Sequence, residues 1–316
     1  MKKENNLYWS IYKNLEKEVI ELSNHIYFSD DQLDVYSIKI AELIIRCSIE
    51  IESIVKELYE QNGGDMNPVD ENGQKRDLYF DTDCMDYIEN KWKLSKKKVF
   101  VSATTFYFKE KENLELTPLY KANKRGTSGS KWKQAYQSIK HNRANNISKG
   151  NIKNLIGSMA ALYLLNIYLK DDKITLKKGE FVSNESEKFD TSRGSDIFSI
   201  TMKFVAFPGA KPKNKIDCTN TLDYENHVYL KIADDETCKK EWNRIEENTK
   251  KIIIEMLPIL QKKEKHLNQF NSIWEIVNEH GEKRYVEKAI LDTMPRVFDI
   301  IPIAVLNKNQ IVYSNE

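Results

Sequence analysis

The residues best suited to chemistry lie in one short segment, residues 131–143, which reads KWKQAYQSIKHNR. Its end places the imidazole of His141 directly after Lys140 and two positions before Arg143. Four further cations open this segment or shortly precede it: Lys124, Arg125, Lys131 and Lys133. Because closely spaced cationic side chains bind the phosphates of a polyanion, the sequence predicts a surface here for a partner such as RNA.

The net charge of +1 hides an uneven distribution along the chain. Residues 1–90 carry 9 basic and 20 acidic side chains, whereas residues 91–150 carry 15 basic and 3 acidic ones. The rest of the chain carries 25 of each sign. A segment with a net charge of +12 favours polyanion binding, but the acidic first third could also fold against it and neutralise it. The sequence leaves both alternatives open.

Composition and motifs narrow the class of protein. The 316 residues include 16 Tyr, 12 Phe and 5 Trp, which is enough apolar surface for a folded core, and only 11 Gly. The chain contains no P-loop, no dinucleotide-binding glycine motif, no nucleophile elbow and no zinc-protease motif, so we expect no cofactor and no metal. The acidic residues Asp81, Asp83 and Asp86 have the pattern of a helix cap. Four widely spaced cysteines are typical of reduced thiols in a cytoplasmic protein.

The N-terminus has no apolar segment typical of a signal peptide, so export is not expected. The longest apolar run, residues 155–169, is interrupted by Gly157, Ser158 and Asn166 and is shorter than about 20 spanning residues. We therefore expect a buried helix, no membrane partner and a cytoplasmic location.

The pattern of apolar residues predicts a mainly α fold, in which a helical bundle with a small β-hairpin is followed by an α+β C-terminal part. A change of pattern near residue 172 suggests two domains, a helical one over residues 1–172 and an α+β one of unknown role over 173–316. Before the boundary, helices are expected over residues 5–28, 34–61, 81–92, 131–143 and 150–169, and the hairpin over 96–108 and 115–120. After it, strands are expected over 197–207 and 227–233, a helix over 239–260 and a hairpin over 300–314.

The helical periodicity also places Arg143. If one regular helix runs through residue 143, Arg143 shares a face with Trp132 and Tyr136 and points into the bundle. A buried guanidinium needs an acidic partner, and Glu52 lies in the apolar arc of the 34–61 helix. We therefore predict a structural ion pair between Glu52 and Arg143 that joins the two helices.

Three segments in this order, RCSIEIESIVKELY, WKQAYQSIKHNR and NIKNLIGSMAALYLL, resemble the core of the HEPN superfamily over about residues 34–170. Members of that family are α-helical domains that often serve as RNases or RNA-binding modules in bacterial toxins and anti-phage defence. The resemblance implies metal-independent RNA cleavage, with His141 as general acid or base and Lys140 or Arg143 stabilising the phosphate charge. The usual signature of the family, an Arg four to six residues before a His, is absent here.

Two functions fit the sequence. The first is an RNA-binding protein, and in the stronger form an endoribonuclease, that acts in defence or growth arrest and that pairs as a homodimer, as HEPN-like domains commonly do. The second is a non-catalytic interaction protein in which the bundle is structural and the C-terminal part docks a protein partner. A basic groove exposed at His141 favours the first function, and burial of the basic segment by the acidic third favours the second.

Overall fold

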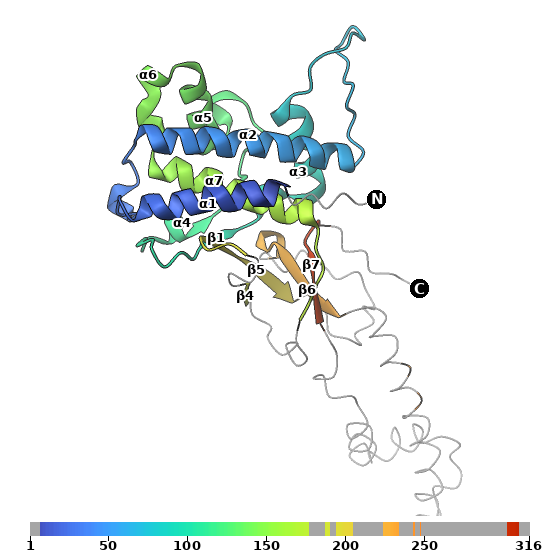
Figure 1. Cartoon of the computed structure of the whole chain (residues 1–316). Coiled ribbons are helices and arrows are strands. Elements are labelled where there is room, and N and C mark those ends of the chain that lie inside the picture. Colours follow the sequence, from blue (N-terminus) through green and yellow to red (C-terminus); the bar gives the residue numbers. More distant parts are fainter. Residues whose placement is uncertain are drawn as a thin grey trace, which may run out of the picture.

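The computed structural model describes residues 7–176, 187–189, 194–204, 224–233 and 302–309, together with Asn243 and Glu247. A layer of helices lies over one β-sheet (Figure 1). The helices are α1 (Leu7–Ser23), α2 (Ile38–Gln61), α3 (Asp86–Trp92), α4 (Lys111–Leu114), α5 (Lys131–His141), α6 (Arg143–Asn146) and α7 (Ile152–Lys170). The strands are β1 (Val99–Val101), β2 (Glu115–Leu116), β3 (Ile174–Thr175), β4 (Glu187–Phe189), β5 (Phe198–Phe204), β6 (Tyr229–Ala233) and β7 (Pro302–Leu306). This arrangement confirms the predicted fold class, mainly α with an α+β part.

The core is built around α7, which is apolar on every side. Asn151 caps its start by accepting a hydrogen bond from the amide of Asn154, and all but five of its residues are buried. Helix α7 is long and apolar enough to cross a membrane, but 78% of its apolar stretch is buried inside this protein, as in the core helix of a soluble protein. The prediction of a buried helix is therefore confirmed. Helix α2 packs against α7 and turns its polar arc, including Lys39, Glu42 and Arg46, to solvent.

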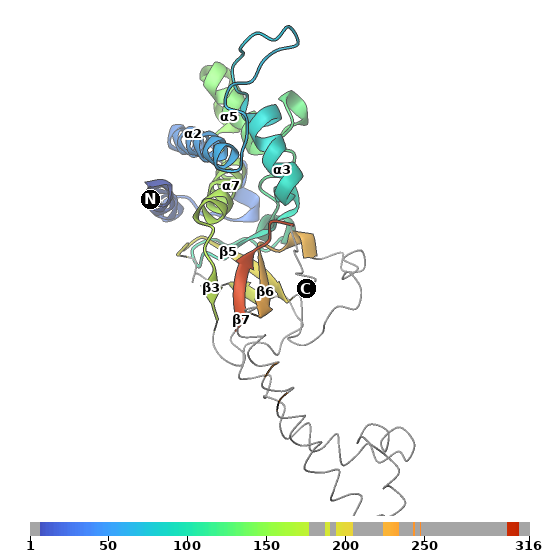
Figure 2. The ribbon, with the colours of Figure 1, turned by 90° about the vertical axis from the view of Figure 1, so that its right-hand side faces the viewer.

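The sheet contains strands that precede residue 172 in the sequence and strands that follow it. Its order is β2-β1-β5-β6-β7-β3, with β4 paired to β5. Strands β5, β6, β7 and β3 are labelled in Figure 2. The antiparallel pair β1–β2, with Val99 opposite Leu116, is the predicted hairpin. Strand β1 also pairs with β5, where Val101 lies opposite Phe198. The predicted strands at 197–207 and 227–233 are confirmed as β5 and β6. Within the predicted helix over 239–260, Asn243 and Glu247 are helical, and the other residues of that helix and the end of the last hairpin lie outside the described residues.

A buried carboxylate joins α1 to the turn that precedes β5. Glu16 is 1% exposed. Its Oε1 atom accepts hydrogen bonds from the Ser195 hydroxyl at 2.6 Å, the Asp196 amide at 2.9 Å and the Ile197 amide at 3.2 Å. Its Oε2 atom pairs with the Lys13 ammonium. The first helix is thus attached to a segment about 180 residues away in the sequence.

A buried lysine makes a second connection of this kind. Lys97 is fully buried just before β1. Its ammonium donates to the backbone oxygen of Glu225 at 2.9 Å and to Oδ1 of Asn309 at 3.0 Å. Burial lowers the pKa of Lys97 to about 7, although the carboxylates of Glu225 and Glu89 oppose that shift. The segments around β6 and β7 are therefore tied to the helical part through polar groups that lie in the core.

The cysteines that the structure describes, Cys47 and Cys84, are buried and form no disulfide. Burial raises the pKa of the Cys47 thiol to about 12 and that of Cys84 to about 11. Neither thiol ionises near neutral pH, which agrees with the structural role expected from their spacing. Cys218 and Cys238 lie outside the described residues.

Candidate nucleic-acid interface

The KHNR sequence lies where α5 ends. Asn142 has φ −151° and ψ 78°, which stops the helix after His141. The side chain of Asn142 then accepts a hydrogen bond from the Asn145 amide and begins α6 at Arg143. Lys140, His141 and Arg143 are all exposed. The three residues predicted to act on RNA therefore lie on either side of one helix break and are exposed. Helices α5 and α6, which carry them, lie at the end of the helical layer (Figure 1).

The predicted ion pair between Glu52 and Arg143 is wrong. The prediction assumed a regular helix through residue 143, but the break at Asn142 turns Arg143 to solvent, where no carboxylate of the described residues lies within 4 Å of its guanidinium. Glu52 is half-buried, and burial raises the pKa of its carboxyl group. The positive charges of Lys140 and Lys133 oppose this shift. Helix α5 thus supplies positive charge near Glu52, but through Lys133 and Lys140 and not through Arg143.

Two of the four cations predicted to bind substrate are held by Asp81 instead. Arg125 Nε lies 2.8 Å from Oδ1 of Asp81, and Lys133 Nζ lies 3.4 Å from its Oδ2. Lys133 is 6% exposed and also donates to the backbone oxygens of Ala122 and Lys124. Burial lowers the pKa of Lys133, and the charge of Asp81 opposes that shift. The assignment of Lys133 to substrate binding is therefore corrected to a structural role, and Arg125 is half-exposed but paired.

The residues predicted as a helix cap form a short π-helical turn, Phe80–Met85, followed directly by α3. Asp83 on this turn receives two hydrogen bonds from the Arg76 guanidinium, at 2.6 and 2.9 Å. Asp86 accepts from the amide of Asn123 at 2.7 Å. Burial would raise the pKa of Asp81, but the hydrogen bond from Arg125 and the charge of Lys133 lower it further than burial raises it. Among the described residues, no group of acids, histidines or cysteines is arranged to hold a metal ion.

Replacing Asp81 by Ala should lower the free energy of unfolding by about 2–3 kcal/mol, because the buried ammonium of Lys133 loses its carboxylate. Urea denaturation would measure this loss. Asp77→Ala, at an exposed site near the same turn, is the matched control and should change stability by less than about 0.5 kcal/mol. Equal stability of the two variants would show that Asp81 does not hold the α5 segment.

The remaining cations of this region form no salt bridge among the described residues, although the ammonium groups of Lys121 and Lys140 lie over the rings of Tyr120 and Tyr136. None of them lies within 4 Å of a carboxylate in the part of the chain that the structure describes, and all are exposed. They belong to connected segments, namely the turn before α5, both ends of α5, α6 and the start of α7. This set, which we call the basic surface, comprises Lys121, Lys124, Lys131, Lys140, His141, Arg143, Lys149 and Lys153. Within the acidic first third, Asp81 thus neutralises Arg125 and Lys133, while the cations of the basic surface remain exposed to solvent.

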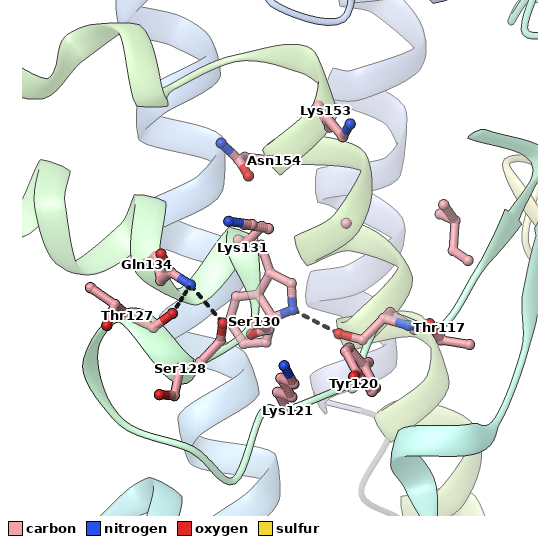
Figure 3. A pocket seen from close by; sticks show the side chains of 15 residues that line it. Thr117, Tyr120, Lys121, Thr127, Ser128, Ser130, Lys131, Gln134, Lys153 and Asn154 are labelled. Atoms are coloured by element: carbon pink, nitrogen blue, oxygen red, sulfur yellow. Dashed lines mark hydrogen bonds between the residues drawn. The ribbon is translucent and has the colours of Figure 1, made fainter. Parts of the chain in front are cut away.

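A pocket of about 380 Å³ opens at the other end of α5. Three segments line it: residues 116–121, the loop and helix start over 127–134, and the first turns of α7 (Figure 3). Three members of the basic surface, Lys121, Lys131 and Lys153, stand around it. At a rise of 1.5 Å per residue, the ten residues from Lys131 to His141 put this pocket about 15 Å from the KHNR end. We refer to it as the α5 pocket.

One wall of the α5 pocket comes from a loop that the sequence makes recognisable. The Gly- and Ser-rich loop before α5 is visible in the sequence, and such loops can approach phosphate closely. Lys153 was missed, because it reaches the pocket from α7, 22 residues farther along the chain than Lys131. No protein-family model, curated protein or solved structure matches this chain.

Proposed function

We propose that the protein binds RNA through the basic surface. The observation that carries the proposal is that its eight cationic or imidazole side chains are exposed and that no carboxylate pairs with them in the described part of the chain. These cations can neutralise phosphates without first breaking an ion pair inside the protein. The likeness of residues 34–170 to HEPN domains supports RNA rather than another polyanion as the partner.

We further propose that His141 supports RNA cleavage. His141 would act as general acid or base, while Lys140 and Arg143 stabilise charge on the phosphate without a metal ion. An exposed imidazole between two unpaired cations at a helix break can approach an RNA backbone from solvent. In the HEPN-like setting a homodimer would bring two such ends together, and the activity would serve anti-phage defence or growth arrest in the cytoplasm.

RNA binding can be tested by fluorescence anisotropy with a labelled single-stranded RNA at two salt concentrations. Changing Lys140 and Arg143 to Gln and His141 to Ala should weaken binding by about tenfold or more and should reduce the slope of log affinity against log salt by about one to two. Lys56→Gln, at an exposed position on α2 outside the basic surface, is the control and should bind as the original protein does. RNA binding that is absent, or that does not depend on salt, would contradict the proposal.

Cleavage is tested separately with tRNA and total RNA. His141→Ala should slow cleavage by about 100-fold or more while RNA affinity falls only slightly, since general acid–base catalysis contributes about 10²–10⁴-fold. Equal cleavage by both proteins, or none by either, would remove the catalytic part and leave RNA binding to be judged by the anisotropy experiment. It would then favour the interaction protein, whose C-terminal part docks a protein partner.

A further inference from the structure

The buried amine of Lys97 lies against the side-chain amide of a residue near the other end of the chain. Its Nζ atom is 3.0 Å from Oδ1 of Asn309, and 212 positions separate the two residues. Because a C=O bond is about 1.23 Å long, the Cγ carbon of Asn309 lies no more than about 4.2 Å from that nitrogen. An approach of at most about 1 Å would bring the two atoms to the separation of about 3–3.5 Å from which such groups react.

The fold holds Asn309 in place beside the amine. Its backbone amide donates to Oδ1 of Asn307 at 3.1 Å. The side chain of Asn307 donates in turn to the backbone oxygen of His227 at 3.0 Å, and the backbone oxygen of Asn307 accepts from the Tyr168 hydroxyl at 2.7 Å. These bonds tie the end of β7 to the start of β6 and to α7. Fixed groups of this kind need no chance collision, which lowers the entropic part of a reaction barrier.

Lys97 is also held in place, and it is closed off from water. The side chain is fully buried, as are Leu94 and Val99 near it in the sequence. Its Nζ atom donates a second hydrogen bond to the backbone oxygen of Glu225 at 2.9 Å. Burial lowers the pKa of Lys97 to about 7, so a large share of the amine is neutral and nucleophilic near neutral pH. Exclusion of water also protects a newly formed amide bond from hydrolysis.

The charged groups that face the amine leave it without an ion pair. The carboxylates of Glu225 and Glu89 and the ammonium of Lys96 act on it electrostatically. The Glu225 carboxylate pairs with Lys96 instead, and the Glu89 carboxylate accepts from the hydroxyl and the amide of Ser95, at 2.6 and 2.8 Å. In the described part of the chain, no carboxylate forms an ion pair with Lys97. Its strongest printed side-chain contact is therefore with a neutral amide, that of Asn309.

We propose that Lys97 and Asn309 join in an intramolecular isopeptide bond. The lone pair of the neutral amine on Nζ attacks Cγ of Asn309. One proton passes from Nζ to Nδ2 of the side-chain amide, the bond between Cγ and Nδ2 breaks, and ammonia leaves. The product is a secondary amide between Nζ and Cγ, and the reaction consumes no other reactant. Asn309 is partly exposed, so the ammonia can escape to solvent.

The bond would join the residue before β1 to the residue after β7 and close a loop of 212 positions. A covalent link across a long loop stabilises a fold because it restricts the unfolded chain. Until the bond forms, Lys97 keeps a free amine whose titration affects the stability of the protein. The inference does not depend on RNA binding by the basic surface.

Intact mass spectrometry of the full chain tests the bond. We expect protein that is refolded from urea and kept at pH 8 to lose about 17 Da, the mass of one ammonia. Digestion should then give one branched peptide in which Lys97 is joined to Asn309. Lys97→Met and Asn309→Ala should keep the masses that their sequences give, whereas Lys56→Met, at an exposed site, should lose ammonia as the original protein does.

Three results of that experiment would overturn the proposal. The first is a folded protein whose mass stays unchanged over several weeks. The second is a gain of about 1 Da from deamidation of Asn309 alone. The third is an equal loss of ammonia in Asn309→Ala, which would place the reaction elsewhere in the chain.

The rate of mass loss provides a second measurement that needs no variant to fold. The reaction should be about tenfold faster at pH 8 than at pH 6, because the neutral fraction of an amine with a pKa of about 7 changes by that factor. Near-UV circular dichroism would confirm that the protein is folded at both pH values. Equal rates would show that the neutral amine of Lys97 is not the attacking group, against the proposal.

Discussion

Replacing Glu16 by Ala should lower the free energy of unfolding by about 4 kcal/mol or more. The change removes the acceptor of the Asp196 amide and of the Ser195 and Tyr12 hydroxyls, and it leaves the Ile197 amide with Ser195 Oγ alone, at 3.2 Å. Each buried donor left unpaired costs about 1–3 kcal/mol, and bonds to a carboxylate lie at the upper end of that range. Urea denaturation of the variant would measure the loss.

Two further substitutions sharpen this test. Glu16→Gln keeps an acceptor oxygen but not its charge, so its loss of stability should be intermediate. Glu21→Ala, at an exposed position on the same helix, should change stability by less than about 0.5 kcal/mol. In Glu16→Ala, amide hydrogen exchange should accelerate first at Asp196 and Ile197. A loss below about 1 kcal/mol, with normal exchange at these amides, would show that α1 is not held to the sheet through Glu16.

The stability of the protein should rise between pH 7 and pH 9 because of Lys97. The pKa of this amine is about 7 in the folded protein and 10.5 when unperturbed. Between these values the unfolded chain binds a proton that the folded protein does not, so the free energy of unfolding increases with pH. The gain should be about 2–3 kcal/mol over these two pH units and on the order of 4–5 kcal/mol over the whole interval. Below about pH 6 this contribution is constant, since both states hold the proton.

The difference between the original protein and Lys97→Met isolates this effect from other titrating groups. Relative to Lys97→Met, the original protein should gain about 2–3 kcal/mol from pH 7 to pH 9 in parallel denaturation series. The difference in free energy of unfolding between the original protein and Lys56→Met, a change at an exposed site, should not vary with pH. If the difference between the original protein and Lys97→Met also does not vary with pH, the Lys97 amine keeps an ordinary pKa in the folded protein.

The local parts of the fold could be predicted from local sequence. Helix α7 follows from a long apolar run after an asparagine cap, and α5 starts as expected after Ser130. Its end was mispredicted, because Asn142 forms a new cap with its own side chain and the periodic pattern of the neighbouring residues does not reveal that choice. One residue at the break therefore reversed the expected orientation of Arg143.

The candidate site was predictable only as a charged region. The sequence identifies the cations of residues 121–143, and their exposure at Lys124, Lys131 and Lys140 agrees with that interpretation. Which of them remain available depends on Asp81, about 50 residues earlier, and no spacing rule connects it to Lys133. The α5 pocket also depends on tertiary structure, since α7 contributes one side of it.

The mixed sheet sets an order in which the chain can complete its fold during synthesis. Strand β1 lies about 100 residues before β5 and about 200 before β7. At about 5–20 residues per second, the edge of β1 waits about 5–20 s for β5, and the sheet about 10–40 s for β7. During that time the helices can already form. The edge of β1 that will pair with β5 and the carboxylate of Glu16 still lack their hydrogen-bond partners, so other chains can bind there. A nascent chain of this protein should therefore need protection by a chaperone until residues 195–204 have emerged.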